Sequence, residues 1–256
     1  MLNYRIEGDG PPLLLLHGFG ISFNIWTELT PLLRGRFSLV TVELPGIGLS
    51  PLPPPTDTSA ALSASPYLAA AVDALDSLRA SLGLPRWSVI GYSSGSRVAE
   101  AYLQAHPDRV ERVVFLAPAY TSKDKAFGLR VASRVDACFP FLGDWVLSGW
   151  RIRFLIRLLG FNLQRHPFVP AWYAEITSQP VEVLKETLRS MPDGGARPFE
   201  VPTQIPALFV WGREDLITAA PRKPSACDVV IHANHSMPQT RSYQALAAIL
   251  PFLLGK

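Results

Sequence analysis

The sequence predicts an α/β fold, with a mostly parallel β-sheet flanked by helices and an inserted α-helical cap. Short apolar runs alternate with helical patterns up to Pro118. From there to residue 202 the chain is helical and aromatic, and a strand pattern resumes at Ala207. Because alternating strands and helices form parallel sheets with right-handed crossovers, we expect a core of residues 1–118 and 203–256. Residues 119–202 would leave the sheet as the cap and then return to it.

The first elements follow from apolar runs and turn residues. The run 13–16 is four leucines between turn signals, which is typical of a strand buried on both faces. Residues 2–7 would form an edge strand before it. Apolar residues at helical spacing predict one helix over 23–33, and 37–42 would be the next strand.

The middle of the core has clear helix boundaries. Ser65 and Pro66 are typical of a helix start, and Gly83 would end the helix of residues 67–82. The remaining expected elements are strands at 87–90, 110–116, 207–211 and 228–231, a helix from residue 96 that stops at His106, and a terminal helix at 240–253. In that last helix we expect Tyr243, Leu246, Ile249, Leu250 and Leu253 to share the face that closes the core.

Composition excludes several classes of protein. The 24 Lys and Arg residues are spread along the chain and nearly matched by 21 Asp and Glu, so no nucleic-acid partner is expected. Cys138 and Cys227 lie far apart and form no metal-binding pair, so we expect buried free thiols and neither metal nor cofactor. No apolar run reaches about 18 residues, and residues 1–7 do not resemble a signal peptide. The expected location is cytoplasmic.

The pentapeptide Gly91-Tyr92-Ser93-Ser94-Gly95 is the stretch most directly linked to chemistry. It lies between a predicted strand and a predicted helix, which is the context of a nucleophile elbow. The sharp reversal would expose the Ser93 hydroxyl, while the glycines leave room for strand and helix to approach each other. Ser93 is therefore the candidate nucleophile.

A serine hydroxyl needs a base to take its proton and an acid to orient that base. Asp215 follows the strand 207–211, and His235 follows the strand 228–231. Since parallel strands end at one edge of a sheet, Ser93, Asp215 and His235 can meet there.

Alternatives remain for the acid and the base. Glu214 could be the acid in place of Asp215, or Asp215 could simply cap a following helix. His232 competes with His235, although it lies within or at the end of its strand. Asp228 would lie at the wrong edge of the sheet, and His17 is better interpreted as a residue that organises its loop.

The loop after the strand 13–16 is the candidate oxyanion site. Gly18 and Gly20 allow the backbone to approach a ligand closely, so we expect the N–H groups of Phe19 and Ser94 to hold a tetrahedral oxyanion. A dinucleotide-binding fingerprint is rejected because Phe23 stands where its third glycine should be.

Taken in order, these motifs resemble those of α/β-hydrolase-fold enzymes with a helical cap. The resemblance covers essentially the whole chain and implies a triad of Ser93, His235 and Asp215, with Phe19 and Ser94 as oxyanion donors. Serine at the elbow disfavours epoxide opening and halide displacement, for which relatives use aspartate. The motifs are His17-Gly18-Phe19-Gly20, Pro45-Gly46-x-Gly48-x-Ser50, the pentapeptide around Ser93, Gly212-x-x-Asp215 and His235.

This chain departs from the family pattern at three positions. Glu43 stands where the family usually has aspartate, Ile47 where it usually has histidine, and Asn234 where it often has glycine. None of the three replaces a predicted catalytic group, but they set the chain apart from any one subfamily.

The cap sequence favours a lid over an apolar pocket. Residues 145–159 are apolar and interrupted by arginines, of which Arg153 and Arg157 share a helical face while Arg151 does not. A peripheral membrane contact is the less favoured alternative. We expect a small, hydrophobic ester substrate.

The leading hypothesis is a cofactor-independent serine hydrolase that cleaves carboxylic esters through an acyl-enzyme. The same site could instead serve C–C cleavage, lactone opening or perhydrolysis, because the fold alone does not choose among them. A non-catalytic ligand-binding or accessory protein is the alternative from another class.

Overall fold

The computed structural model describes residues 1–52, 65–120, 138, 140–148, 150–151, 168–191, 198–221 and 223–256. In this described part of the chain, seven strands form one sheet in the order β1-β3-β2-β4-β5-β6-β7. β1 pairs antiparallel with β3, and every other pair is parallel, which confirms the mostly parallel sheet. The strands are β1 (Tyr4–Glu7), β2 (Pro12–Leu16), β3 (Ser38–Val42), β4 (Trp87–Tyr92), β5 (Val110–Leu116), β6 (Ala207–Gly212) and β7 (Asp228–Ile231).

Successive side chains of the central strands enter two separate cores. Leu13 and Leu15 pack in one cluster and Leu14 and Leu16 in the other, all of them fully buried. This alternation is why an uninterrupted leucine run suits a strand covered on both faces. The first core is covered by η1 (Phe23–Trp26), α1 (Thr30–Leu33), α9 (Met237–Thr240) and α10 (Ser242–Leu253), and the second by α2 (Pro66–Ser81) and α3 (Gly95–Ala105).

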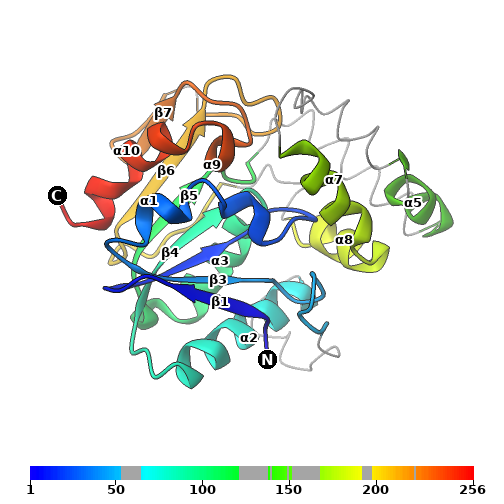
Figure 1. Cartoon of the computed structure of the whole chain (residues 1–256), viewed down its shortest axis with the longest axis horizontal. Coiled ribbons are helices and arrows are strands. Elements are labelled where there is room, and N and C mark those ends of the chain that lie inside the picture. The colour runs from blue at the N-terminus through cyan, green and yellow to red at the C-terminus, as the bar shows by residue number, and fades with distance from the viewer. Residues whose placement is uncertain are drawn as a thin grey trace.

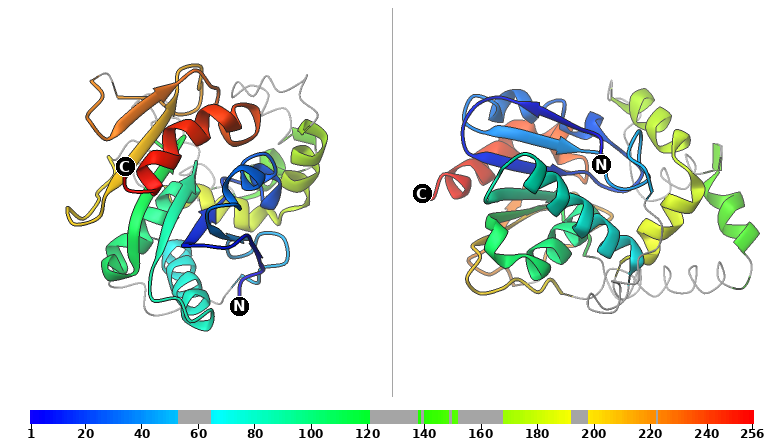
Figure 2. Two further views of the ribbon diagram at one scale, coloured as in Figure 1. Left: turned by 60° about the vertical axis from the view of Figure 1, so that its left-hand side comes forward. Right: turned by 90° about the horizontal axis from the view of Figure 1, so that it is seen from below.

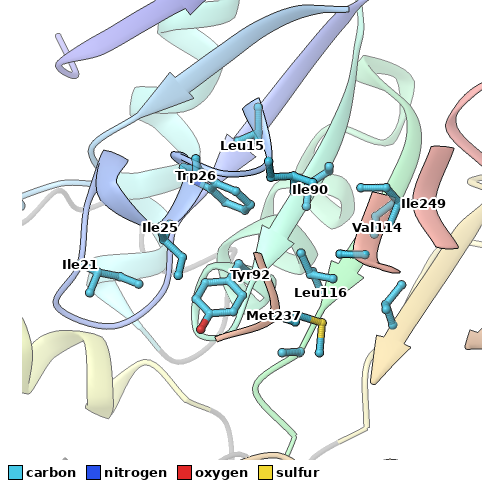
Figure 3. Close-up of a cluster of buried hydrophobic side chains, with 14 of the residues drawn as sticks. Leu15, Ile21, Ile25, Trp26, Ile90, Tyr92, Val114, Leu116, Met237 and Ile249 are labelled. Atoms are coloured by element: carbon cyan, nitrogen blue, oxygen red, sulfur yellow. The ribbon is translucent and has the colours of Figure 1, made fainter. Parts of the chain in front are cut away.

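Figure 3 shows part of the first core close to the carboxyl ends of the strands. Ile90 of β4 and Leu116 of β5 lie among side chains from η1, such as Trp26, and from the C-terminal helices, such as Met237 and Ile249. The core thus reaches the rim where the candidate site lies, and Tyr92, the residue before Ser93, is 1% exposed.

One predicted helix is interrupted, and the predicted terminal helix is not. The helix expected over 23–33 is a 3-10 turn followed by the short α1, because Pro31 in the first turn of α1 lacks the N–H that would continue the earlier turn. The terminal helix expected over 240–253 is confirmed as α10, and the short helix α9 precedes it as a separate element.

The predicted buried face of the terminal helix is partly wrong. Ala245, Ile249 and Leu253 form its buried stripe, and Leu246 and Leu250 are partly buried beside it. Tyr243 is 73% exposed because it falls outside the arc centred on that stripe.

The expectation of buried thiols is also wrong. Cys138 and Cys227 are both exposed free cysteines. Cys227 lies in the turn that precedes β7, where the N–H of Cys227 donates to the Ser225 hydroxyl, so its position in a surface turn outweighs the general tendency of cysteine to be buried. Within the described ranges, no helix is both long and apolar enough to cross a membrane.

Three described helices lie in the predicted cap segment: α5 (Pro140–Leu147), α7 (Val169–Ser178) and α8 (Val181–Arg189). They gather at one end of the molecule, opposite the C-terminus (Figures 1 and 2). An ion pair between Lys185 Nζ and Asp144 Oδ1, at 3.0 Å, joins α8 to α5. The exact limits of the cap stay a prediction, and Arg153 and Arg157 lie outside the described residues.

Candidate active site

Ser93 occupies a strained turn between β4 and α3. Its φ of 51° lies in the left-handed region that non-glycine residues rarely adopt, at a cost of about 1–3 kcal/mol. The turn is tight, since a Cβ added to Gly91 would lie 2.8 Å from the carbonyl oxygen of Gly95, and one added to Gly95 would collide with the carbonyls of Leu16 and His17. The glycines therefore let the chain reverse, as expected for the elbow.

Backbone hydrogen bonds hold this turn in place. The N–H of Ser93 donates to the carbonyl of Leu116 at the end of β5, 3.1 Å away. The Ser93 carbonyl accepts from the N–H groups of Ser96 and Ala119 at 3.0 and 3.1 Å. Because surrounding main chain fixes the turn on both sides, the strain at Ser93 persists in the folded protein.

A buried ion pair fixes the helix that follows Ser93. Arg97 Nη1 lies 2.8 Å from Glu100 Oε2, and both side chains are at most 3% exposed. Arg97 also donates to the carbonyl of Ala119, and Glu100 accepts from the N–H of Glu200. The pair thus connects α3 to the segments at both ends of the predicted cap.

The structure brings the three predicted triad side chains together. His235 Nε2 lies 2.9 Å from Ser93 Oγ, and His235 Nδ1 lies 2.8 Å from Asp215 Oδ2. A carboxylate can only accept, so Nδ1 donates to Asp215 and Nε2 of the neutral ring is left to accept from the Ser93 hydroxyl. This is the arrangement that base-assisted activation of a serine requires.

Asp215 is held as an anion in a buried position. Its side chain is 1% exposed and also accepts from the N–H groups of Ile217 and Thr218 and from the Thr218 hydroxyl. Burial by itself raises the pKa of Asp215, but the charge of His235 and the hydrogen bonds from His235 and Thr218 outweigh it and hold the pKa below its ordinary value. Asp215 is therefore suited to fix the His235 ring.

The competing residues lie elsewhere. His232 and Glu214 pair with each other at 3.2 Å on the surface, with side chains 70% and 55% exposed. Asp228, at the start of β7, accepts from the Trp211 indole and from Ser225. The carboxylate that His235 Nδ1 contacts is that of Asp215, as the position of Asp215 after β6 predicts.

The loop that carries Phe19 is organised by His17. Its Nδ1 donates to the Gly18 carbonyl, and its Nε2 accepts from the Leu44 N–H, both at 2.9 Å. Burial lowers the pKa of His17 to about 4, against the raising effects of the Gly18 hydrogen bond and the Glu43 charge, so the ring is neutral at pH 7. A Cβ on Gly18 would lie 3.0 Å from Ser93 Cβ, so the loop lies directly against the elbow.

Glu43 holds this loop to the turn after β3. Its carboxylate accepts from the Ser22 hydroxyl at 2.7 Å, from Asn3 Nδ2 at 2.8 Å and from the Leu49 N–H at 2.7 Å. No sequence pattern assigned this role to Glu43, although an acid beside a Gly-rich turn was a usable signal.

Ile47 and Asn234, the other two positions at which the chain departs from the family pattern, also have local roles. Ile47 is a 1% exposed core residue, and Asn234 Oδ1 accepts from the Ser236 N–H and the Thr240 hydroxyl, which fixes the start of α9 beside His235. Tyr92 is a further supporting residue that no motif had singled out, since its hydroxyl donates to the His235 carbonyl at 3.1 Å.

A small pocket adjoins Gly18 and Ser94, beneath α8. Its described wall is mixed, and the apolar lining expected of the substrate pocket stays a prediction. Burial raises the pKa of Tyr67 to about 12, against a lowering hydrogen bond with Thr187, so its hydroxyl stays protonated. The wall combines apolar Leu44, Ile47 and Val98 with the hydroxyl-bearing Tyr67, Thr187 and Ser190.

Comparisons with known proteins agree with this architecture. Residues 11–228 match the profile of the alpha/beta hydrolase fold family. A pimeloyl-[acyl-carrier protein] methyl ester esterase of Aeromonas hydrophila subsp. hydrophila is 29% identical over 261 residues, which cover 97% of each chain.

Solved structures share the fold over the whole chain. An epoxide hydrolase from Bacillus megaterium superposes with a TM-score of 0.73 at 19% identity, covering 100% of this chain and 97% of that one. A thermophilic esterase from Thermogutta terrifontis has a TM-score of 0.67 at 24% identity, covering 99% and 93%. Because the family profile matches most of the chain, residues 11–228, the chain belongs to the alpha/beta hydrolase fold family.

Proposed function

We propose that the protein is a serine hydrolase that cleaves carboxylic esters through an acyl-enzyme. The observation that carries the proposal is the continuous pair of hydrogen bonds from Ser93 Oγ to His235, 2.9 Å, and from His235 to Asp215, 2.8 Å. In this proposal Ser93 is the nucleophile, His235 the general base and Asp215 the group that fixes the tautomer.

The chemistry follows from these roles. Ser93 Oγ attacks the ester carbonyl while its proton passes to His235 Nε2, and the imidazolium is stabilised by Asp215. His235 then protonates the departing alkoxide, which leaves as an alcohol. A water molecule, deprotonated by His235, attacks the acyl-enzyme and releases the acid, and the proton returns to Ser93.

The proposed oxyanion donors are the N–H groups of Phe19 and Ser94. Among the described residues, neither group is bonded to a backbone or side-chain acceptor, so both are free to donate to a substrate oxygen. Preorganised donors of this kind contribute about 2.7–4 kcal/mol each to transition-state stabilisation.

An ester is the substrate class that the relatives and the nucleophile favour. The Aeromonas relative, which covers nearly the whole chain, is named as a methyl ester esterase. The serine nucleophile also suits acyl transfer from an ester. A hydrophobic portion of that ester remains the expectation from the aromatic cap sequence, and the chain-length series below tests it.

The test is hydrolysis of p-nitrophenyl esters from acetate to decanoate, followed by methyl esters of the preferred acids. We expect turnover, and a pre-steady-state burst of p-nitrophenol whenever deacylation is slower than acylation. Ser93→Ala is the control and should show neither. If the native protein hydrolyses none of these esters, ester hydrolysis is not its activity.

A further inference from the structure

The cap helix α7 lies directly against the loop that carries Phe19. Gly20, with φ of 64°, is packed so closely that a Cβ there would lie 2.5 Å from Ile176 Cγ1 and 3.1 Å from Leu184 Cδ2. Ile176 is 1% exposed and Leu184 is fully buried. The loop is thus enclosed between the core and the cap rather than lying open to solvent.

Glu175, one residue before Ile176, bonds to the end of the same loop. The N–H of Ser22 donates to Glu175 Oε2 at 3.4 Å, and the N–H of Asn24 also acts on this carboxylate by lowering its pKa. Burial raises the pKa of Glu175, the two N–H donors oppose the rise and the nearby Glu43 charge adds to it. Glu175 is thus a half-buried carboxylate whose hydrogen-bonding partner is the main chain of this loop.

Gln179 is one helical turn further along and bonds to the other loop at this rim. The N–H of Gly48 donates to Gln179 Oε1 at 3.1 Å, and Gln179 Nε2 donates to the Glu175 carbonyl at 3.1 Å. Gln179 directly follows the last residue of α7, and the bond from its side-chain amide to the Glu175 carbonyl holds it against the end of that helix.

Glu43 completes the connection on the core side. It accepts from the Ser22 hydroxyl and from the N–H of Leu49, the neighbour of Gly48. Together with the peptide bond between Gly48 and Leu49, these hydrogen bonds therefore join the Ser22 end of the loop to the turn after β3 and to the end of α7.

The loop of residues 17–22 is consequently fixed at both ends. His17 bonds its beginning to the Leu44 N–H, and Ser22 joins its end to Glu43 and Glu175. Phe19 lies between these attachments. We propose, on the basis of the proposed function, that Glu175 and Gln179 are positioning residues that keep the Phe19 N–H in place to receive the oxyanion.

The experiment compares Glu175→Ala with Glu175→Gln, which removes the charge but keeps an acceptor for the Ser22 N–H. Glu182→Ala is the matched control, because this α8 glutamate is 61% exposed and pairs with Arg189. The readouts are kcat and KM for a p-nitrophenyl ester and the inhibition constant of a trifluoromethyl ketone. That inhibitor forms a tetrahedral adduct whose oxyanion needs the same donors.

We expect Glu175→Ala to lower kcat by about 10- to 100-fold, since small misplacements of catalytic groups have effects of this order. KM should change little, and the inhibition constant should rise by the factor that kcat/KM loses. Glu175→Gln should restore most of kcat, and Glu182→Ala should behave as native. Gln179→Ala should produce a smaller loss of the same kind and serves as the second variant if Glu175→Ala does not fold.

Labelling of native Ser93 by a fluorophosphonate is measured first, because its absence would count against the proposed function itself. With labelling established, an unchanged inhibition constant in the Glu175 and Gln179 alanine variants overturns the positioning role alone. Equal damage by Glu175→Gln and Glu175→Ala also overturns it, because the amide keeps the acceptor that the positioning role requires.

Discussion

Two loops at the same rim each contain a buried histidine, yet the two rings have different partners. Among the residues that the structure describes, the His17 ring, after β2, bonds to main chain alone, namely the Gly18 carbonyl and the Leu44 N–H. His235, after β7, bonds to the Asp215 carboxylate and the Ser93 hydroxyl. Position and burial are alike, so partners alone distinguish a ring that organises a loop from one able to move a proton.

Replacement of Ser93 or His235 should give the largest loss of turnover. If the proposed function is correct, Ser93→Ala or His235→Ala should lower kcat by about 10⁶-fold, the loss known for the serine and histidine of a serine hydrolase triad. Circular dichroism and thermal unfolding should show that both variants still fold. Retention of a tenth of native turnover by either variant would remove that residue from the chemistry.

Replacement of Asp215, the acid that contacts His235, should give the next largest effect on turnover. Asp215→Asn is expected to lower kcat by about 10⁴-fold, because an amide no longer selects the tautomer in which Nδ1 carries the proton. Glu214→Gln is the matched control, since Glu214 pairs with exposed His232, and it should remain near native. If the two variants were equally impaired, the assignment of the acid would be wrong.

His17 should influence stability through pH. Its pKa is about 4 in the folded protein and about 6.5 when unfolded, so below pH 6.5 the unfolded chain binds a proton that the folded chain does not. The contribution of neutral His17 to the free energy of unfolding is complete above pH 6.5. It decreases by about 3 kcal/mol as the pH falls to 4. Urea unfolding across this range measures the decline.

A His17→Gln variant sharpens that measurement because glutamine does not titrate. Its dependence on pH between 6.5 and 4 should be shallower than that of the native protein, whatever its absolute stability. Parallel curves for the two proteins would mean that other groups cause the decline.

Tyr92 should give the smallest effect. Tyr92→Phe removes the hydroxyl that donates to the His235 carbonyl, and it leaves that carbonyl without this donor. We expect a loss of about 1–2 kcal/mol in unfolding free energy, and a fall in kcat of less than tenfold. A loss of activity as large as that of Asp215→Asn would show that Tyr92 does more than support the histidine.

Much of the fold could be predicted because its signals are local. The leucine run of β2, the Ser65 and Gly83 boundaries of α2 and the tight glycines around Ser93 each constrain a few neighbouring residues. The meeting of Ser93 with Asp215 and His235 follows from parallel strands ending at one edge.

Other features depend on contacts between distant segments. Glu175 lies on a cap helix, and no periodicity reveals that it bonds to the Ser22 N–H. The exposure of Tyr243 depends on how α10 rotates against the sheet, and that of Cys227 on a surface turn. These features are determined by packing between distant segments, which local sequence patterns do not predict.

The most direct test of the central claim is the rate at which a fluorophosphonate modifies Ser93, followed by peptide mass spectrometry in native protein and in His235→Ala. We predict a single adduct on the Ser93 peptide of the native protein and labelling at least about 10³-fold slower without the imidazole. An unmodified Ser93 in the native protein, or equal labelling rates in the two proteins, would contradict the claim that His235 activates this serine.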